Sequence, residues 1–387
     1  MRDTDTDADQ HWDVVVVGAG PAGATAARSA ARGGARVLLL DKAVFPRYKT
    51  CGGGIIGQSR SRLTAQALAT IEADLPEVGF SHRMGRVTRV RTESPFVAMV
   101  DRERFDQANV DAATEAGVVF RDGANVRALA DEDGRTRLTL SDGEELVARV
   151  VVGADGSGGR VGRYVGAVMA ATDLGLEVEV PRRPEDAATG LLLDWGPHPG
   201  TYAWLFPKSD TLTVGVIERK GHADQTRRYL DDWIERLGLH PSDQDRSSGH
   251  LTQWRTSGSP LRRGTVVLAG ETAGLLEPWT REGISFALRS GEWAGEAAAA
   301  HAGGDPAALD RYASRVQAEL VPEIVAGEQL LRVFTRFPGA FHFLIAKTGF
   351  GRRYFIRFCR GETTLARAFR RRWVRTVTGL LARTPAS

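Results

Sequence analysis

The pattern of apolar and polar positions divides the chain into two kinds of segment. Short continuous apolar runs, typical of strands buried on both faces, occur at 12–17, 36–40, 148–152 and 265–269. An Ala-rich segment, 21–32, joins the first two runs and favours a helix. This order of strand, helix and strand predicts a parallel sheet covered by helices.

A second pattern occupies the middle of the chain. Four short extended runs, separated by turn signals, predict an antiparallel sheet inserted between two parts of the first domain; they lie at 175–180, 190–194, 201–206 and 211–217. Residues 87–91 and 96–100 are expected to form a strand pair, and Asp142-Gly143 a hairpin turn. Alternation places Tyr202, Trp204 and Phe206 on one face, either in the core or along an apolar pocket.

A glycine-rich element follows the first apolar run directly. Gly18-Ala19-Gly20-Pro21-Ala22-Gly23 has the spacing G-x-G-x-x-G and opens the predicted helix, whose N-terminus offers unpaired N–H groups to a pyrophosphate. Asp41 ends the second run 18 residues after Gly23, close to the roughly 20 expected for a carboxylate that binds an adenosine ribose. The complete arrangement predicts a Rossmann-like dinucleotide site for FAD or NAD, and Asp41 argues against a 2′-phosphate.

Three further segments contain candidate ligand-binding residues. Cys51 precedes three glycines in a loop, Asp155 follows a predicted strand in Gly153-Ala154-Asp155-Gly156, and Glu271 lies in Gly270-Glu271-Thr272-Ala273-Gly274. A carboxylate at the carboxyl end of a strand can reach a ligand that lies across the sheet. For Cys51 and Asp155 an ordinary structural role, as a buried thiol and as a turn acid, is the alternative from the sequence.

Composition limits the class of protein. A hydrophobic content of 42% and a charged content of 26% are those of a soluble globular protein. The polar N-terminus, residues 1–10, is expected to be a disordered tail and not a signal peptide, and no apolar run is long enough to cross a bilayer. Only two cysteines occur, far apart, and no spaced His/Cys metal set is present, which favours a reducing cytoplasm and no metal site.

The net charge of +3 is unevenly distributed. Eleven basic residues and one acid, Glu362, lie between Lys347 and Arg383, with aromatic residues among them. This basic amphipathic segment is interpreted either as a peripheral membrane contact or as helices that pack on the body with a solvated Arg face. No aromatic-rich sheet motif supports nucleic-acid binding.

Together these motifs resemble the FAD-dependent geranylgeranyl reductase family, a branch of the flavoprotein fold shared with p-hydroxybenzoate hydroxylase. The resemblance covers about residues 12–330. Its most specific parts are Phe45-Pro46-Arg47…Cys51-Gly52-Gly53 and Tyr202-x-Trp204-x-Phe206-Pro207-Lys208, and it also includes Asp101-Arg102-Glu103-Arg104-Phe105-Asp106 and Glu282-Gly283-Ile284.

The resemblance implies an α/β fold, α+β overall, with four parts. These are a disordered tail (1–10), a Rossmann-like FAD-binding domain (11–80, 101–170 and 263–300), an antiparallel-sheet substrate domain (81–100 and 171–262) and a basic, amphipathic helical C-terminal region (301–387). The implied FAD-binding residues are Gly18, Ala19, Gly20, Pro21, Ala22, Gly23, Asp41, Lys42, Arg47, Cys51, Gly52, Arg102, Val126, Asp155, Gly270, Glu271, Gly274, Gly283 and Ile284.

The implied catalytic residues are Cys51, at the isoalloxazine near a substrate alkene, Tyr202 and Trp204, which shape a prenyl pocket with Phe206, and Arg281. Two positions depart from the family pattern, because Glu271 stands where Asp is usual and Arg281 where Gly is usual. Arg281 is expected to place a cation near the reduced flavin or the substrate.

The function implied is hydride transfer from reduced flavin to a carbon–carbon double bond of a hydrophobic isoprenoid, with NADPH or reduced ferredoxin as electron donor. The first alternative is an FAD-dependent monooxygenase of a hydrophobic or aromatic secondary metabolite. The second is a membrane-attached flavin-binding sensor without catalysis. The exact substrate, the donor and the oligomeric state stay open.

Overall fold

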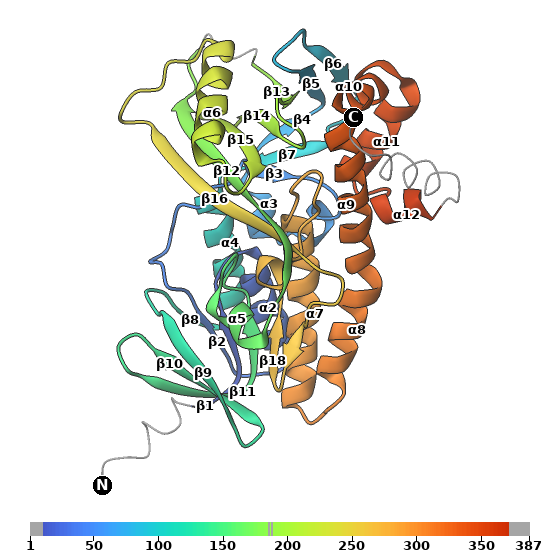
Figure 1. Cartoon of the computed structure of the whole chain (residues 1–387). Helices are drawn as coiled ribbons and strands as arrows, with labels where there is room; N and C mark the ends of the chain where they lie inside the picture. The colour runs from blue at the N-terminus through green and yellow to red at the C-terminus, as the bar shows by residue number, and fades with distance from the viewer. Residues whose placement is uncertain (1–10, 185, 187–188, 371–387) are drawn as a thin grey trace.

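The computed structural model describes residues 11–184, 186 and 189–370. The expected tail, residues 1–10, and the last part of the basic segment, residues 371–387, lie outside the described residues. Figure 1 shows one sheet at the end near the N-terminus, a second sheet at the opposite end, and C-terminal helices along one side of both. The mixed α/β architecture predicted from the sequence is confirmed.

The first sheet is built on the continuous apolar runs. Its strands are β1 (His11–Val17), β2 (Val37–Leu40), β8 (Val119–Arg121), β9 (Val126–Glu132), β10 (Arg135–Leu140), β11 (Glu145–Gly153), β17 (Arg262–Arg263) and β18 (Val266–Leu268). The order is β17-β18-β11-β1-β2-β8, with β10 and β9 extending from β11. The central pairs are parallel, and the predicted turn at Asp142-Gly143 joins β10 and β11 as an antiparallel hairpin.

Glycines bring two helices close together beside this sheet. Helix α2 (Pro21–Arg32) packs against the sheet and against α7 (Ile284–Ala302). A Cβ atom at Gly291 would lie 2.3 Å from Ala22 O, and one at Gly295 would lie 2.2 Å from Ala26 O. The α7 backbone therefore approaches α2 closely, which fixes the N-terminus of α2 at the carboxyl edge of β1.

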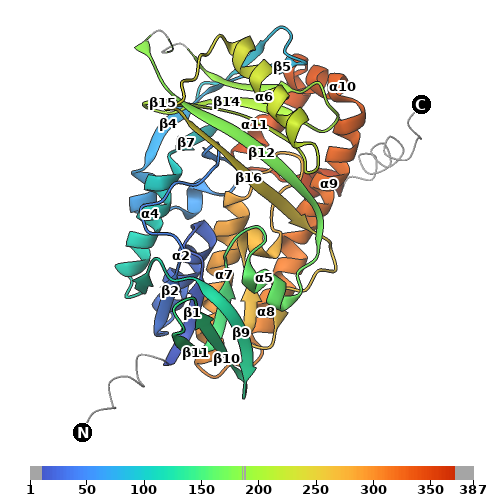
Figure 2. The same ribbon diagram turned by 60° about the vertical axis from the view of Figure 1, so that its left-hand side comes forward.

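The second sheet contains seven strands. They are β16 (Arg246–Arg255), β12 (Met169–Pro181), β15 (Thr211–Arg219), β14 (Tyr202–Pro207), β13 (Leu191–Trp195), β5 (Glu77–His82) and β6 (Thr88–Arg91), in that order. The four predicted runs lie in β12, β13, β14 and β15, and the pairs among them are antiparallel, as predicted. Strand β5, which was not among the predicted runs, pairs with β13 in parallel. Figure 2 shows β12 and β16 crossing the molecule diagonally, and α6 (Ala223–Leu237) covers one face.

A third, small sheet corrects another expectation. Its strands are β3 (Gly54–Ile55), β7 (Val97–Val100) and β4 (Ile71–Leu75), and β7 pairs with the other two. The predicted pairing of 87–91 with 96–100 is therefore wrong, because β6 pairs with β5. Between them Thr92 N donates to Pro76 O and Phe96 N to Leu75 O, which leads the chain from one sheet into the other.

Helices complete the molecule. Those of the N-terminal and middle parts are the 3₁₀ turn η1 (Arg60–Arg62), α3 (Ala65–Leu68), α4 (Arg102–Thr114), α5 (Arg160–Val165) and the 3₁₀ turn η3 (Gly270–Ala273). The C-terminal ones are α8 (Ala308–Glu319), α9 (Val321–Arg336), α10 (Pro338–His342), the π-helical turn η4 (Phe343–Lys347), α11 (Gly349–Cys359) and α12 (Leu365–Phe369). Among the described residues, no helix has the length and apolar character needed to span a bilayer.

The described part of the basic segment packs on the body. Phe355, Ile356 and Cys359 of α11 are buried, and the Phe355 ring meets the Phe80 ring edge to face, with 5.2 Å between centroids. The helix-packing interpretation therefore holds for this stretch, while a membrane contact stays a prediction.

Candidate active site

One large cavity, of about 1050 Å³, lies among the carboxyl ends of the first sheet, the small sheet and the second sheet. It brings together eighteen of the twenty-two residues predicted for the site. These are Gly18, Gly20, Pro21, Ala22, Asp41, Lys42, Arg47, Cys51, Gly52, Arg102, Val126, Asp155, Tyr202, Trp204, Glu271, Arg281, Gly283 and Ile284. The other four, Ala19, Gly23, Gly270 and Gly274, lie behind its wall.

The glycine-rich turn has the geometry its spacing predicts. Gly18 has φ +102, and a Cβ atom there would lie 2.3 Å from Ala154 O. At Gly20 a Cβ atom would meet only Arg47 Nη2, at 3.6 Å, so this backbone faces open space. A Cβ atom at Gly23 would lie 1.7 Å from Gly18 O, which makes Gly23 a packing residue between helix and strand. No side chain caps the N-terminus of α2, so its N–H groups are available to an anion.

Asp41 is held in place at the end of β2. Its Oδ2 accepts a hydrogen bond of 2.7 Å from Ala19 N, and its Oδ1 accepts one of 2.9 Å from Ala43 N. The residue is 8% exposed. Ala19, predicted to bind the cofactor, thus orients Asp41, while Lys42 and Val126 line the cavity beside it.

Two arginines share one buried carboxylate. Asp106 is fully buried, and its Oδ1 and Oδ2 accept hydrogen bonds of 3.0 and 2.8 Å from Nε and Nη2 of Arg102. Arg47 Nη1 lies 3.0 Å from Asp106 Oδ2. Burial acts to lower the pKa of Arg102, but the opposing effects of Asp106 and the nearby Cys51 sulfur leave it raised. Asp106 therefore aligns two cations that face the turn, where a pyrophosphate would bind.

Two acids on neighbouring turns reach the same part of the cavity. Asp155 Oδ2 accepts a hydrogen bond of 3.0 Å from Val161 N at the start of α5, and burial raises the pKa of the carboxyl. Glu271 Oε2 lies 3.3 Å from His250 Nε2. Asp155 Oδ1 and Glu271 Oε1 are buried and have no hydrogen-bond partner among the described residues. Both are thus available to a ligand hydroxyl.

Two of the predicted glycines serve the turn around Glu271. Gly270 and Gly274 have φ +57 and +67. A Cβ atom at Gly270 would lie 2.7 Å from the Ala22 Cβ, and one at Gly274 would lie 2.6 Å from Met169 Sδ. They shape the turn that carries Glu271 and do not line the cavity.

A loop, residues 42–53, passes over the cavity and attaches to the second sheet. Glu177 on β12 is the attachment point, because its Oε1 accepts hydrogen bonds from Cys51 N at 2.8 Å and from Tyr48 OH at 3.0 Å. Thr50 Oγ1 donates to Ser248 Oγ at 3.0 Å. Cys51 is thereby held over the cavity, and burial raises the pKa of Glu177.

The aromatic ladder lines the cavity, which decides between the two sequence interpretations. The ring centroid of Trp204 lies 5.9 Å from that of Tyr202 and 6.1 Å from that of Phe206. A Cβ atom at Gly52 would lie 2.5 Å from the Phe206 ring, and one at Gly215 would lie 2.1 Å from Trp204 Cζ2. Both glycines therefore give these rings room.

Beyond the ladder the cavity is apolar. Its walls are Ile56, Val78, Phe96, Val97, Leu191, Leu193, Trp195, Leu276, Trp279, Phe355 and Cys359. Trp195 and Trp279 stack with 6.2 Å between ring centroids. Burial raises the pKa of the Cys359 thiol, and both cysteines are free. The lining of this chamber suits a hydrophobic ligand and offers few groups that could bind a polar ligand.

The loop before α7, residues 279–283, lines the cavity. Arg281 has φ +57, an unusual conformation for a residue with a side chain. Its Nε and Nη2 donate to Asp173 Oδ2 at 2.9 and 2.7 Å, so its charge is paired. Glu282 Oε1 accepts a hydrogen bond of 2.6 Å from Ser285 N, and burial raises the pKa of Glu282 to about 8.

Several cavity residues were not identified from the sequence. Lys49 lines the cavity. Burial, and after it the positive charge of Arg102, lowers the pKa of the Lys49 amine. Glu177, His250 and Cys359 come from segments that carry no glycine-rich motif. One available signal was Glu177 together with Glu179, two acids at alternating positions among the apolar residues of 174–180.

The cavity fits an FAD molecule. It offers bare backbone at Gly20, a helix N-terminus, paired arginines, an oriented Asp41 and two buried carboxylate oxygens without a hydrogen-bond partner among the described residues. These groups match a pyrophosphate, an adenosine ribose and a chain of hydroxyl groups.

Comparison with known proteins agrees with this geometry. The FAD binding domain family matches residues 11–321. The geranylgeranyl diphosphate reductase of Rhodobacter capsulatus is 31% identical over 301 residues, which cover 75% of each chain. Digeranylgeranylglycerophospholipid reductase 3 of Methanosphaera stadtmanae is 29% identical over 311 residues, 74% of this chain and 77% of the relative.

A solved structure shows the same fold. The geranylgeranyl bacteriochlorophyll reductase-like protein of Thermoplasma acidophilum superposes with a TM-score of 0.76 at 20% identity, covering 96% of this chain and 98% of that one. With the family match and the reductase relatives, the resemblance drawn from the motifs is confirmed. The chain belongs to the FAD binding domain family and is an FAD-dependent oxidoreductase of the geranylgeranyl reductase type.

Proposed function

We propose that the protein reduces carbon–carbon double bonds of a prenyl or isoprenoid compound. The observation that carries this proposal is the continuity of the cavity, whose polar end fits FAD and whose other end is an apolar chamber walled by Trp195, Trp279 and Phe355. Reductases of geranylgeranyl compounds among the relatives support the same substrate class.

The bound FAD would supply the hydride, and the residues of this chain would position it and the substrate. Gly18, Gly20, Arg47 and Arg102 would bind the pyrophosphate, and Asp41 the ribose. Asp155 and Glu271 would bind hydroxyl groups of the ribityl region, and the backbone at Gly283 and Ile284 would face the flavin ring. The stacked walls of the chamber would exclude water from the reacting double bond.

Cys51 is proposed as the catalytic residue nearest to the reacting atoms. Its loop passes over the cavity between the cofactor end and the ladder, and Glu177 fixes its backbone. Tyr202 and Trp204 would align the prenyl chain along the ladder. The electron donor, NADPH or reduced ferredoxin, and the expected cytoplasmic location are proposals from the resemblance and the composition.

The test begins with the protein and its flavin reduced without oxygen. Reoxidation is then followed by absorbance after mixing with a geranylgeranyl compound or with oxygen. We expect fast reoxidation by the prenyl compound, a saturated product by mass spectrometry, and loss of this step in Cys51→Ala with flavin content unchanged.

A matched control is Cys359→Ala, because Cys359 lines the far chamber and has no place near the cofactor end. This variant should keep the reduction step. If prenyl compounds leave the reduced flavin unchanged and oxygen yields a hydroxylated product, the protein is a monooxygenase and the proposal is wrong. If no acceptor is turned over and salt releases the protein from anionic liposomes, the membrane-attached flavin-binding sensor is favoured.

A further inference from the structure

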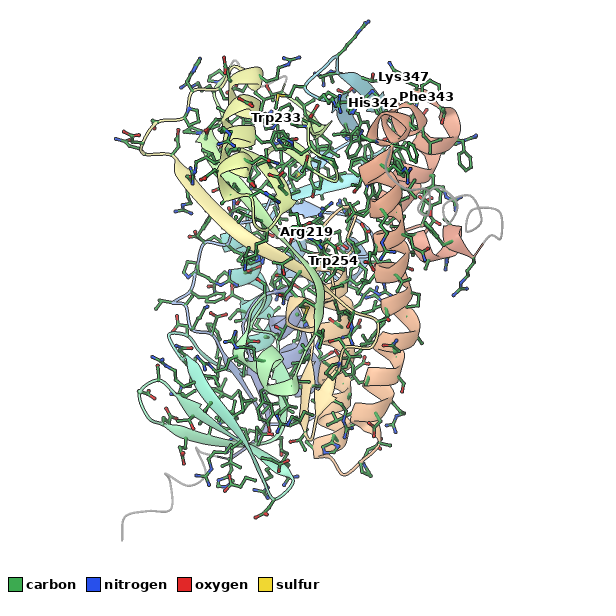
Figure 3. All side chains as sticks on the ribbon, in the orientation of Figure 1. Arg219, Trp233, Trp254, His342, Phe343 and Lys347 are labelled. Atoms are coloured by element: carbon green, nitrogen blue, oxygen red, sulfur yellow. The ribbon has the colours of Figure 1, made fainter. Side chains whose placement is uncertain are left out.

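Large apolar side chains are exposed together where the C-terminal helices reach the far end of the molecule. Phe343 is 63% exposed, Phe350 56% and Leu344 41%. Thr348 joins η4, which carries Phe343 and Leu344, to the start of α11, which carries Phe350. Gly351 N donates to Thr348 Oγ1 at 3.1 Å, and Thr348 Oγ1 donates to Leu344 O at 2.6 Å. The exposure is therefore built into the fold. Figure 3 shows Phe343 and Lys347 at this end.

The segments that carry and adjoin the exposed apolar side chains are rich in basic residues. The sequence has no acid from 329 to 361, and it has the basic residues Arg332, Arg336, Lys347, Arg352, Arg353, Arg357 and Arg360 there. The hairpin of β5 and β6 lies beside α10 and η4 and carries the exposed Arg83, Arg86, Arg89 and Arg91. The nearest acids along these segments are Glu77, Glu93, Glu328 and Glu362, and three of them pair, with Arg89, Arg332 and Arg357 respectively for Glu77, Glu328 and Glu362.

We propose that this end, residues 343–353 with the β5–β6 hairpin, docks on an anionic lipid bilayer. Exposed apolar side chains next to basic residues match the boundary between lipid headgroups and acyl chains. The apolar side chains can insert among the acyl chains, and the basic residues can contact negatively charged headgroups. A second copy of this chain is a poorer occupant, because two such surfaces would bring like charges together.

The docking surface is continuous with the apolar chamber. Phe350 lies in the first turn of α11, and Phe355 and Cys359 of the same helix line the chamber. A bilayer at this end would lie next to the part of the cavity that fits a hydrocarbon chain. The inference goes beyond the proposed reduction, and vesicle binding measures it without any turnover.

The experiment uses the full-length protein and sedimentation with vesicles. Vesicles of phosphatidylcholine mixed with phosphatidylglycerol should bind the protein, pure phosphatidylcholine much less, and added salt should weaken binding. Phe343→Ser/Phe350→Ser should lower the partition coefficient about tenfold, because apolar area leaves the interface. Lys347→Glu should lower it roughly fivefold or more.

Matched controls lie away from this end. Val119→Ser/Val168→Ser removes two exposed apolar side chains, 47% and 53% exposed, and Arg127→Glu reverses one exposed charge on β9. Both should bind vesicles as the unchanged protein does. Flavin content and thermal unfolding show that each variant is folded.

Three results would overturn the inference. One is vesicle binding by Phe343→Ser/Phe350→Ser equal to that of the unchanged protein, which would assign any binding to residues 371–387. Another is the absence of binding by the unchanged protein. The third is a dimer, seen by light scattering, that both phenylalanine substitutions dissociate, since the surface would then join two copies.

Discussion

Arg281 and Asp173 form a buried ion pair that joins the loop before α7 to strand β12, 108 residues apart in the sequence. The side chains are 5% and 1% exposed. Arg281 Nη2 also donates to Gly200 O at 3.1 Å, and its Nη1 donates to Trp279 O at 2.9 Å. The guanidinium thus connects three segments that border the cavity.

This pair stabilises an arginine at position 281, where the resemblance to the family implies a glycine. The backbone there has φ +57, which a glycine adopts without cost and an arginine only at a cost of about 1 kcal/mol. Hydrogen bonds and charge pairing with Asp173 offset that cost. The cation expected near the reduced flavin or the substrate lines the cavity, and its charge is paired with that of Asp173. Its place beside the flavin stays a prediction.

Removing Arg281 alone should therefore destabilise the protein even though glycine suits the backbone. Arg281→Gly leaves Asp173 buried, with only Arg219 Nη1, at 3.8 Å, nearby. We expect the free energy of unfolding to fall by about 3 kcal/mol. Denaturant unfolding measures this change.

The double variant Arg281→Gly/Asp173→Asn is the control for charge. It should regain most of the lost stability, because neither an unpaired charge nor the unfavourable φ remains. Equal stability of Arg281→Gly and the unchanged protein would show that the pair contributes no more than the backbone cost that it offsets.

Two glycines of the same motif should respond differently to alanine. Gly23→Ala places a methyl group 1.7 Å from a backbone oxygen that cannot move aside, so we expect loss of folded protein. Gly20→Ala meets only ordinary contacts and should fold, but its methyl group faces the cofactor end, so FAD content should fall. Thermal unfolding and flavin absorbance separate the two effects, and full flavin content in Gly20→Ala would contradict the assigned pyrophosphate site.

The attachment of the Cys51 loop gives a prediction that rests on the proposed function. Glu177→Ala removes the acceptor of Cys51 N and Tyr48 OH, so the loop should lose its position while FAD stays bound. We expect kcat for prenyl reduction to fall roughly tenfold.

Glu177→Gln keeps one acceptor oxygen and should restore most of the rate. Tyr48→Phe removes only the hydroxyl contact and should have the smaller effect. A Glu177→Ala variant with unchanged kcat would show that the loop needs no attachment.

Glu282 should make stability depend on pH. Burial raises the pKa of its carboxyl from 4.5 to about 8, so between these values the folded chain binds a proton that the unfolded chain has released. The stabilisation that this proton gives the folded chain is complete below pH 4.5 and is lost as the pH rises through about 8. Relative to Glu282→Gln, the unfolding free energy of the unchanged protein should fall across this window, and parallel pH profiles would contradict the assignment.

The parts that could be predicted from the sequence are those set by neighbouring residues. The glycine-rich turn, the helix after it, the hairpin at Asp142-Gly143 and the shared face of Tyr202 and Trp204 all follow from backbone preferences and alternation over a few positions. Asp41, Arg102, Asp155 and Glu271 reach the cavity for the same reason, because each comes within a few residues after a strand.

The remainder depends on contacts between distant segments. No local sequence pattern indicates these contacts in advance. They include the pairing of β6 with β5 in place of β7, the parallel pair of β13 and β5, and the attachment of Cys51 to Glu177. Phe355 and Cys359 line the chamber only because α11 folds back on the second sheet. Local preferences determined the elements and the FAD fingerprint, whereas the partner of Arg281 and the shape of the apolar chamber were decided by packing, since burial and charge pairing are satisfied across the whole fold.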